Sequence, residues 1–421
     1  MKTFLLSLAW QSAWNRRFTL ALTICAIALS SFMLLGVERI RTDLRDSFTS
    51  AVSGADLVVG ARTGSVQLLL YSVFHVGAAT NNIRWSSVQE IERQRGVAWV
   101  IPLSLGDSHR GFPVLGTSSA YFEHFRHGER QALKIAQGKP FDDLFDAVIG
   151  ADVAQRLGYR PGDRITLAHG SGELNLTEHA DKPFTISGVL ARTGTPVDRT
   201  VHISLEAMEA LHIDWLGGLP VPNMGVDAEK ARQMQLVPRN VTAALVGLEN
   251  RAAVFSVQRA VNRFSQEPLM AILPGVALDE LWEVIGTGER GMLLMAVLTS
   301  LVSIGGLVSV ILAGLNERRR ELAVLRAIGA TPRHIVMLLA WEGFLIAAGG
   351  VLLGALALVA GGLLLGPWLQ ATYGLTLHVL QPTALQAIMA AALLATGWLA
   401  SLLPGWRAYR LSLADGLSPR I

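Results

Sequence analysis

The stretch NERRRELAVLRAIGATPRHI, residues 316–335, decides how the rest of the chain is arranged. It is polar and helix-favouring, and a long apolar run flanks it on each side. Its charged residues have the spacing of side chains that pair along a helix surface, and its apolar residues fall on one side of the same helix. We therefore expect an amphipathic helix over 317–328.

The residues that follow predict how this helix ends. Gly329 is placed to close it, because a helix often ends in a left-handed residue that only glycine adopts cheaply. Thr331 offers an N-cap hydroxyl, and Pro332 stands at the first position of the next helix, where its missing N–H costs nothing. A basic loop that only orients the protein would not require this order. The sequence predicts a short helix, a sharp turn and a membrane helix.

Four apolar segments predict a membrane protein. Of the 421 residues, 51% are hydrophobic and 16% are charged. The apolar residues concentrate in segments 18–37, 291–315, 335–366 and 383–403, and each reaches the roughly 20 residues that cross a bilayer as a helix. The first run is longer than the roughly 7–15 residues of a signal-peptide core, and no A-x-A site follows it. We interpret it as a retained anchor.

Basic residues predict the orientation of these segments, since cytoplasmic flanks carry an excess of Lys and Arg. They lie before the first segment, in 316–334 and after the fourth segment, whereas the short loop 367–382 has none. We expect both termini to be cytoplasmic, with an amphipathic helix over 1–17 and a tail over 404–421. The segment 38–290 is then outside, although three of its residues run against the rule: Arg39, Arg41 and Arg45.

The outer segment 38–290 predicts an α+β domain. Short strands are mixed with helices without regular alternation. The only cysteine, Cys25, lies in the first membrane segment, so the domain has no disulfide, and a domain of this size can bury a sufficient core without one. Gly106-Asp107 predicts a turn between strands over 97–103 and 111–115.

Glycines and one carboxylate stand out in the membrane segments. Gly350 and Gly354 form a G-x-x-x-G, and Gly305 and Gly306 lie mid-segment. Small residues let helices approach closely in lipid, although glycine is also simply commoner there. Glu342 is a structural hydrogen-bond partner or part of a coupling apparatus, and both readings stay open.

Catalytic motifs are missing from the sequence. There is no G-x-x-x-x-G-K-[ST] for ATP, no G-x-S-x-G and no H-E-x-x-H, so we expect no catalytic residue. The net charge of +3 comes from the inner flanks, and no aromatic-interleaved basic patch suggests nucleic acid. Eight of the ten histidines lie in the outer segment 38–290, but only His124 and His127 are weak metal candidates, because they stand three apart beside Glu123.

Three motifs carry a family resemblance. Residues 316–335, followed by the Gly-rich stretch 342–354, resemble the permeases of FtsX/MacB-type ABC transporters, also called type VII or mechanotransmission transporters. LPGWRA at 403–408 resembles their C-terminal boundary, with Gly405 in place of the usual alanine. DAVIGADVAQRLGYRPGDRITL at 146–167 is similar to the strand, helix and PGD turn of their periplasmic domain.

This resemblance implies four transmembrane helices, with a large α+β extracytoplasmic domain between the first and second, in a bacterial inner membrane. It implies a non-catalytic subunit that pairs with a second permease copy or paralogue and with a separate cytoplasmic ATPase dimer, which binds the ATP and Mg²⁺. The ATP cycle would move the outer domain for export, extraction or handling of a periplasmic or outer-leaflet cargo. A periplasmic adaptor or cargo protein and membrane lipids are the other expected partners.

The resemblance also implies that 317–328 is the coupling helix, with Leu322, Leu325 and Ile328 packed into the ATPase. The residues expected to set the register and form the turn are Glu317, Arg318, Arg320, Glu321, Arg326, Gly329 and Pro332. Two alternatives stay open. One is a signalling complex that activates a cell-wall hydrolase or senses peptides, and the other is a metal-handling membrane protein.

Overall fold

The computed structural model describes residues 17–52, 54–170, 179–216, 219–220, 225–317, 319–327, 329–373 and 377–410. They form two compact units. The helical unit takes in the described residues of Met1–Asp43, Gly286–Trp368 and Leu377–Ile421. The α+β domain takes in those of Leu44–Ile285 and Leu369–Thr376.

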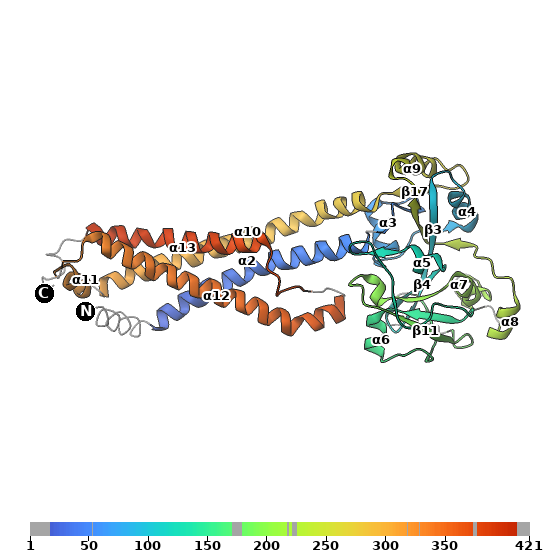
Figure 1. Ribbon diagram of the computed structural model, residues 1–421, viewed down its shortest axis with the longest axis horizontal. Helices are drawn as coiled ribbons and strands as arrows, with labels where there is room; N and C mark the ends of the chain where they lie inside the picture. The colour runs from blue at the N-terminus through green and yellow to red at the C-terminus, as the bar shows by residue number, and fades with distance from the viewer. Residues whose placement is uncertain are drawn as a thin grey trace. The chain divides into compact units, whose positions relative to one another are not determined.

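Four long helices make up the helical unit, and each is long and apolar enough to cross a membrane. They are α2 (Arg17–Ala51), α10 (Pro274–Glu317), α12 (Pro332–Tyr373) and α13 (Ala384–Arg410). The short helix α11 (Arg319–Ala327) connects α10 to α12 (Figure 1). The helices run past the predicted membrane segments, because backbone hydrogen bonding does not stop where the apolar run stops. The predicted helix over 1–17 lies outside the described residues except for Arg17, which begins α2, and so does the tail beyond Arg410.

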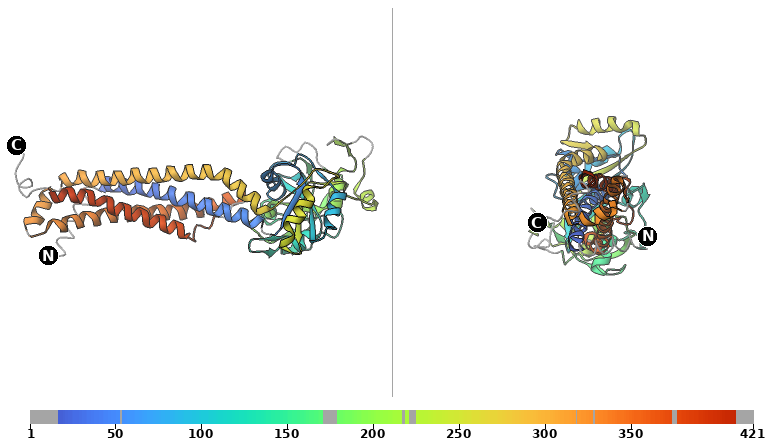
Figure 2. Two further views of the ribbon diagram at one scale, coloured as in Figure 1. Left: turned by 90° about the horizontal axis from the view of Figure 1, so that it is seen from above. Right: turned by 90° about the vertical axis from the view of Figure 1, so that its left-hand side faces the viewer.

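The helices of this unit pack side by side around a leucine- and isoleucine-rich core, as both views show (Figures 1 and 2). This core includes Ile27 and Leu34 of α2, Leu307 of α10, Leu339 of α12 and Leu393 of α13. Many other apolar residues stay exposed, for example Val302 and Leu364. An apolar outer surface is what a lipid-facing bundle needs, since lipid tails are as apolar as leucine.

The α+β domain is built on an eleven-stranded mixed sheet (Figure 1). Nine strands follow the order β17-β1-β16-β3-β4-β12-β8-β11-β7, while β10 pairs with β3 and β9 pairs with β11. Their bounds are β1 Leu57–Ala61, β3 Val97–His109, β4 Phe112–Thr117, β7 Ile135–Gly138, β8 Asp146–Ile149, β9 Arg164–Ile165, β10 Ala168–His169, β11 Phe184–Leu190, β12 Val201–Ser204, β16 Ala243–Leu248 and β17 Leu269–Ile272. The helices of the domain are α3 Ser65–Ser72, α4 Trp85–Glu92, α5 Ala120–His124, α6 Ala151–Leu157, α7 Leu205–His212, α8 Ala228–Gln233 and α9 Val254–Asn262. The mixed strand directions confirm the predicted α+β class.

The predicted turn at Gly106-Asp107 is wrong. Strand β3 runs without a break for 13 residues, and the chain reverses instead at Arg110-Gly111, where φ is +47° and +82°. The pairing of β3 with β4 shifts register between Leu105 and Ser108. Such a bulge absorbs an extra residue within a ladder and re-aims the side chains around it. The glycine signal therefore marks a bulge, and Asp107 points into the domain, where only 3% of it is exposed.

The stretch 146–167 folds as its sequence predicts. Strand β8 leads into α6, and Gly158 closes that helix in the left-handed region with φ +72°. Gly162 of the Pro-Gly-Asp turn has φ +99°, and β9 follows. Both glycines occupy conformations that other residues rarely adopt.

Candidate functional site

Helix α11 and the turn after it form the element on which the functional prediction depends. Gly329 has φ +99°, and its N–H donates to the carbonyl of Arg326 at 3.1 Å, so α11 closes as predicted. Helix α12 begins at Pro332. At its start the N–H of Thr331 donates to Nδ1 of His334 at 3.2 Å, and the Thr331 hydroxyl lies 2.9 Å from the same nitrogen. The side chain of His334 thus accepts a hydrogen bond from the N-cap residue, as Glu or Gln does in a capping box.

The two faces of α11 differ from the prediction. Leu322 is only 8% exposed and belongs to the core of the helical unit, together with Leu315 and Ile335. It therefore packs within its own chain and is not offered to a partner. Ala323 is also buried, whereas Val324 is 58% exposed. Amphipathicity identified an apolar face but did not show that the neighbouring helices cover it.

The other predicted residues of this element are only partly described. Arg326 is half-buried, and Pro332 begins α12. Arg318 and Ile328 lie outside the described residues, as do the side chains of Glu317, Arg320, Glu321 and Leu325. Their role stays a prediction.

The G-x-x-x-G of α12 is a helix contact. A Cβ on Gly350 would lie 2.6 Å from Cβ of Ile27, and a Cβ on Gly354 would lie 2.5 Å from the carbonyl oxygen of Ala28. Only glycine lets α12 approach α2 this closely. By contrast, a Cβ on Gly305 or Gly306 of α10 would meet no atom of the described residues within 4 Å. Within the described residues these two glycines contact no neighbouring helix, so their role in packing stays a prediction.

Glu342 is half-buried on α12. The next residue, Gly343, touches α13 closely, because a Cβ there would lie 2.4 Å from Cβ of Ser401. Glu342 thus lies beside a tight helix contact.

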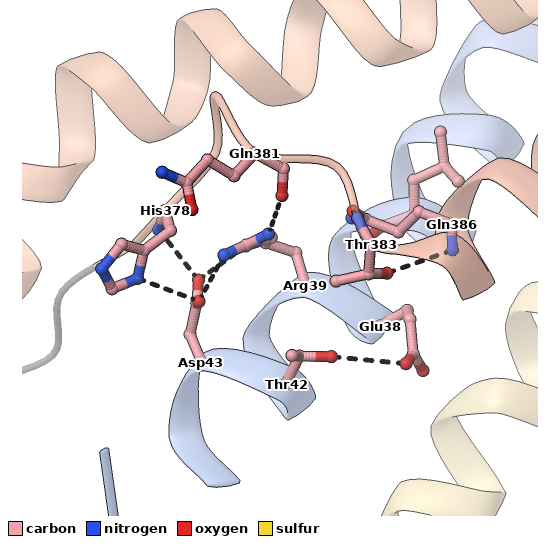
Figure 3. A network of polar contacts seen from close by, with 9 residues as sticks. Glu38, Arg39, Thr42, Asp43, His378, Gln381, Thr383 and Gln386 are labelled. Carbon is pink, nitrogen blue, oxygen red and sulfur yellow. Dashed lines mark hydrogen bonds and ion pairs between the residues drawn. The ribbon is translucent and has the colours of Figure 1, made fainter. Parts of the chain in front are cut away.

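A polar network joins α2 to the start of α13 within the helical unit (Figure 3). Arg39 donates from Nε and Nη2 to the two oxygens of Asp43, at 2.8 and 2.6 Å, and both residues are nearly fully buried. Arg39 also donates to the carbonyl of Gln381 at 2.5 Å, and the N–H of His378 donates to Asp43 at 3.1 Å. Gln386 donates to the carbonyl of Leu35 at 2.9 Å. These contacts fix the connection before α13 to α2.

The other two arginines that run against the positive-inside rule, Arg41 and Arg45, also have partners. Arg41 pairs with Glu38 at 3.2 Å and with Glu289 of α10 at 3.0 Å. Arg45, in the α+β domain, lies over the ring of Trp282 at 5.8 Å. Each of the three arginines thus has a partner that stabilises its charge within the fold.

Known families match both units of the chain. The sequence profile of the MacB-like periplasmic core domain matches residues 20–263, more than half of the chain, and that of the FtsX-like permease C-terminal matches residues 293–413. The chain belongs to the FtsX/MacB-type permeases. It is thus a multi-pass membrane protein with a periplasmic domain, from a family of non-catalytic ABC transporter subunits that work with cytoplasmic ATPases.

Two solved structures are similar to part of this FtsX/MacB-type permease. The periplasmic region of MacB from Actinobacillus actinomycetemcomitans has 11% identity, covers 56% of this chain and 97% of its own, and gives a TM-score of 0.33. The extracellular domain of the noncanonic ABC-type transporter YknZ from Gram-positive bacteria has 11% identity. It covers 51% of this chain and 98% of its own, and the TM-score is 0.30. A comparison with curated protein sequences found no match.

The histidine pair predicted as a weak metal site in the periplasmic domain does not form one helix face. Helix α5 ends at His124, and Phe125 is extended, with φ −61° and ψ 136°. His127 belongs to β5 (Arg126–His127), and the ring of His124 stacks on Trp99 with centroids 5.4 Å apart. The pair is therefore not preorganised to bind an ion.

A different group of side chains comes together in the same domain: Asp107, His169, His179 and His212. Burial opposes the charge of Asp107, but hydrogen bonds to His169 and His212 outweigh it and lower its pKa to about 2. Burial lowers the pKa of His179 to about 4. Burial also opposes the charge of His212, but the hydrogen bond to Asp107 and the carboxylate charge raise its pKa above the usual value. Sequence reasoning missed this group.

Proposed function

We propose that this chain is the membrane subunit of an ABC transporter that receives the conformational change of a separate cytoplasmic ATPase dimer at α11. The movement passes to the periplasmic domain, where it serves the export, extraction or handling of a periplasmic or outer-leaflet cargo. ATP and Mg²⁺ bind to the ATPase. A second permease copy or paralogue completes the membrane part.

One observation supports this proposal most directly: two continuous helices connect the helical unit to the periplasmic domain. Helix α2 spans Arg17–Ala51 and α10 spans Pro274–Glu317, and each contributes residues to both units. An α-helix keeps a rise of about 1.5 Å per residue while its hydrogen bonds hold, so it carries a displacement along its axis without stretching. Movement at one end of α10 thus reaches the domain at the other end without a separate linker.

The exposed side of α11 is the docking surface in this proposal. Val324 and Ala327 are exposed, while Leu322 and Ala323 are buried in the helical unit. The basic residues around α11 favour a cytoplasmic position, which also puts both termini inside. An apolar side chain that enters a partner pocket contributes more to binding than the charged rim around it.

An ATPase assay on the purified complex tests the proposal. The permease is co-purified with its ATPase in mild detergent and reconstituted. One preparation carries Val324→Asp in the permease, and a second carries Val237→Asp. The two valines have similar exposure, 58% and 54%, but Val237 lies in the α+β domain. We expect Val324→Asp to lower stimulation of the ATPase by about tenfold or more, because a carboxylate placed in an apolar contact costs more than about 1.4 kcal/mol. Equal stimulation by both variants would overturn the assignment of α11.

A further inference from the structure

Four chain segments bring one carboxylate and three imidazoles together inside the periplasmic domain. Asp107 comes from the bulge of β3, His169 from β10, His179 from the segment before β11, and His212 from the last turn of α7. His169 stands directly opposite Asp107 in the antiparallel pairing of β10 with β3. Strand pairing therefore fixes the first two side chains against each other.

The donor atoms have the spacing of metal ligands. Nδ1 of His169 lies 3.0 Å from Oδ1 of Asp107 and 3.1 Å from Nε2 of His212, and that Nε2 lies 3.4 Å from the same Oδ1. One ligand atom from each of the four residues, His179 included, lies within 4.8 Å of the others. Tetrahedral zinc with bonds of 2.0–2.1 Å separates its ligand atoms by about 3.3 Å. The group needs only small shifts to close around one ion.

The surroundings of the group orient it for an ion. Nδ1 of His212 lies 2.9 Å from the carbonyl oxygen of Met208. When Nδ1–H donates to that oxygen, the lone pair of Nε2 is left for a metal, which is the usual outer support of a ligating histidine. The ring of Trp215 packs 4.5 Å from that of His179 and 5.3 Å from that of His169, so an apolar wall covers one side.

His179 supplies an independent observation. It is 1% exposed, and neither of its ring nitrogens has a hydrogen-bond partner within the part of the chain that the structure describes. The same holds for Oδ2 of the buried Asp107. Buried polar atoms without partners are rare in native proteins, and each calls for an explanation such as an ion.

A buried ion pair holds His179 in place. Nζ of Lys182 lies 3.0 Å from both oxygens of Asp214, and Lys182 is fully buried. The N–H of Lys182 donates to the carbonyl of His179 at 3.2 Å. Asp214 precedes Trp215, so this pair ties the segment of His179 to the residue that covers the group.

We propose that Asp107, His169, His179 and His212 bind one divalent transition-metal ion, with Zn²⁺ preferred, in the periplasmic domain. Imidazole nitrogens with one carboxylate suit zinc and its neighbours rather than Mg²⁺ or Ca²⁺. Four protein ligands complete a tetrahedron, which is typical of a structural site. The ion links β3, β10 and α7.

Cobalt is a suitable probe, because tetrahedral Co²⁺ absorbs visible light far more strongly than octahedral Co²⁺. The full chain is purified in detergent without a polyhistidine tag, stripped with a chelator and titrated with Co²⁺ and then with Zn²⁺. We expect one tetrahedral Co²⁺ per chain, displacement by Zn²⁺, and a higher melting temperature with Zn²⁺, because an ion that binds only the folded state stabilises it. The variants His179→Ala and His212→Ala should lose about 100-fold or more in affinity.

The double variant His124→Ala/His127→Ala is the matched control and should bind Co²⁺ like the wild type. Failure of the wild type to bind Co²⁺ at micromolar concentration would overturn the proposal. An octahedral spectrum, or one ion still bound by a chain that carries both His179→Ala and His212→Ala, would overturn it as well. The wild-type titration tests the site even where a variant does not fold.

Discussion

The helical unit and the α+β domain bury polar groups in different ways. In the helical unit, the buried pair Arg39–Asp43 lies one turn apart on a single helix. In the α+β domain, Asp107 meets His169 and His212 only because strands and a helix from distant parts of the sequence come together. The pairing of Arg39 with Asp43 is local and follows from helical spacing, although His378 and Gln381 from a distant segment also contact the pair. The arrangement around Asp107 exists only after the sheet has formed.

The largest effect on stability is expected when the carboxylate of Asp43 is removed. Asp43→Ala leaves Arg39 buried without its carboxylate, and breaking a buried pair in this way costs about 3–5 kcal/mol. We expect the detergent-solubilised protein to lose about that much stability in a denaturant titration. Asp46→Ala, on the same helix but exposed, should stay within about 0.5 kcal/mol of the wild type. Equal effects of the two variants would mean that the local pair does not stabilise the helical unit.

A second test compares glycines inside the helical unit. Gly354→Leu forces a side chain against the carbonyl of Ala28, and overpacking of this kind costs about 1–3 kcal/mol. A Cβ on Gly305 would meet nothing within 4 Å in the described residues, so Gly305→Leu should not lower the stability of the single chain. The measurement is the denaturation midpoint of both variants. A loss of dimer by Gly305→Leu alone would instead assign that face to a second copy.

These cases show what the sequence could predict. The spacing of Gly350 and Gly354 is visible in the sequence because it needs only one helical turn, and so is the closing position of Gly329, but the sequence did not show that α2 is the helix in contact. It failed for Leu322, since an apolar face does not state whether the chain itself or a partner covers it. It failed at Gly106-Asp107, where a glycine marks a bulge within β3 rather than a turn. The cluster around Asp107 depends on that bulge and on the pairing of β10 with β3, which single-sequence reasoning could not supply.

A third test is a pH dependence in the α+β domain. His202 is fully buried, its Nδ1 lies 3.1 Å from the carbonyl oxygen of Val148, and burial lowers its pKa to about 3. Above pH 6.5 neither the folded nor the unfolded state is protonated at this residue, so it adds no pH dependence. Below that value only the unfolded state binds the proton, and the free energy of unfolding falls by about 1.4 kcal/mol per pH unit until the folded pKa is reached.

Melting temperatures between pH 7 and 4.5 check this prediction. In the wild type we expect the melting temperature to fall between pH 6.5 and 4.5, which is the acid limb of the profile. His202→Leu should make this fall less steep, whatever it does to stability at neutral pH. An identical acid limb in wild type and His202→Leu would show that the buried imidazole does not control the acid response.

The central claim is that α11 faces the cytoplasm and touches the ATPase, and a single engineered cysteine tests it most directly. With Cys25→Ser, the chain has no other cysteine. We predict that Val324→Cys resists a membrane-impermeant maleimide added outside and crosslinks to the co-purified ATPase. Val76→Cys, 59% exposed in the α+β domain, should react with the same reagent once the outer barrier is permeabilised. Labelling of Val324→Cys from outside, or no crosslink to the ATPase while Val76→Cys reacts, would contradict the account.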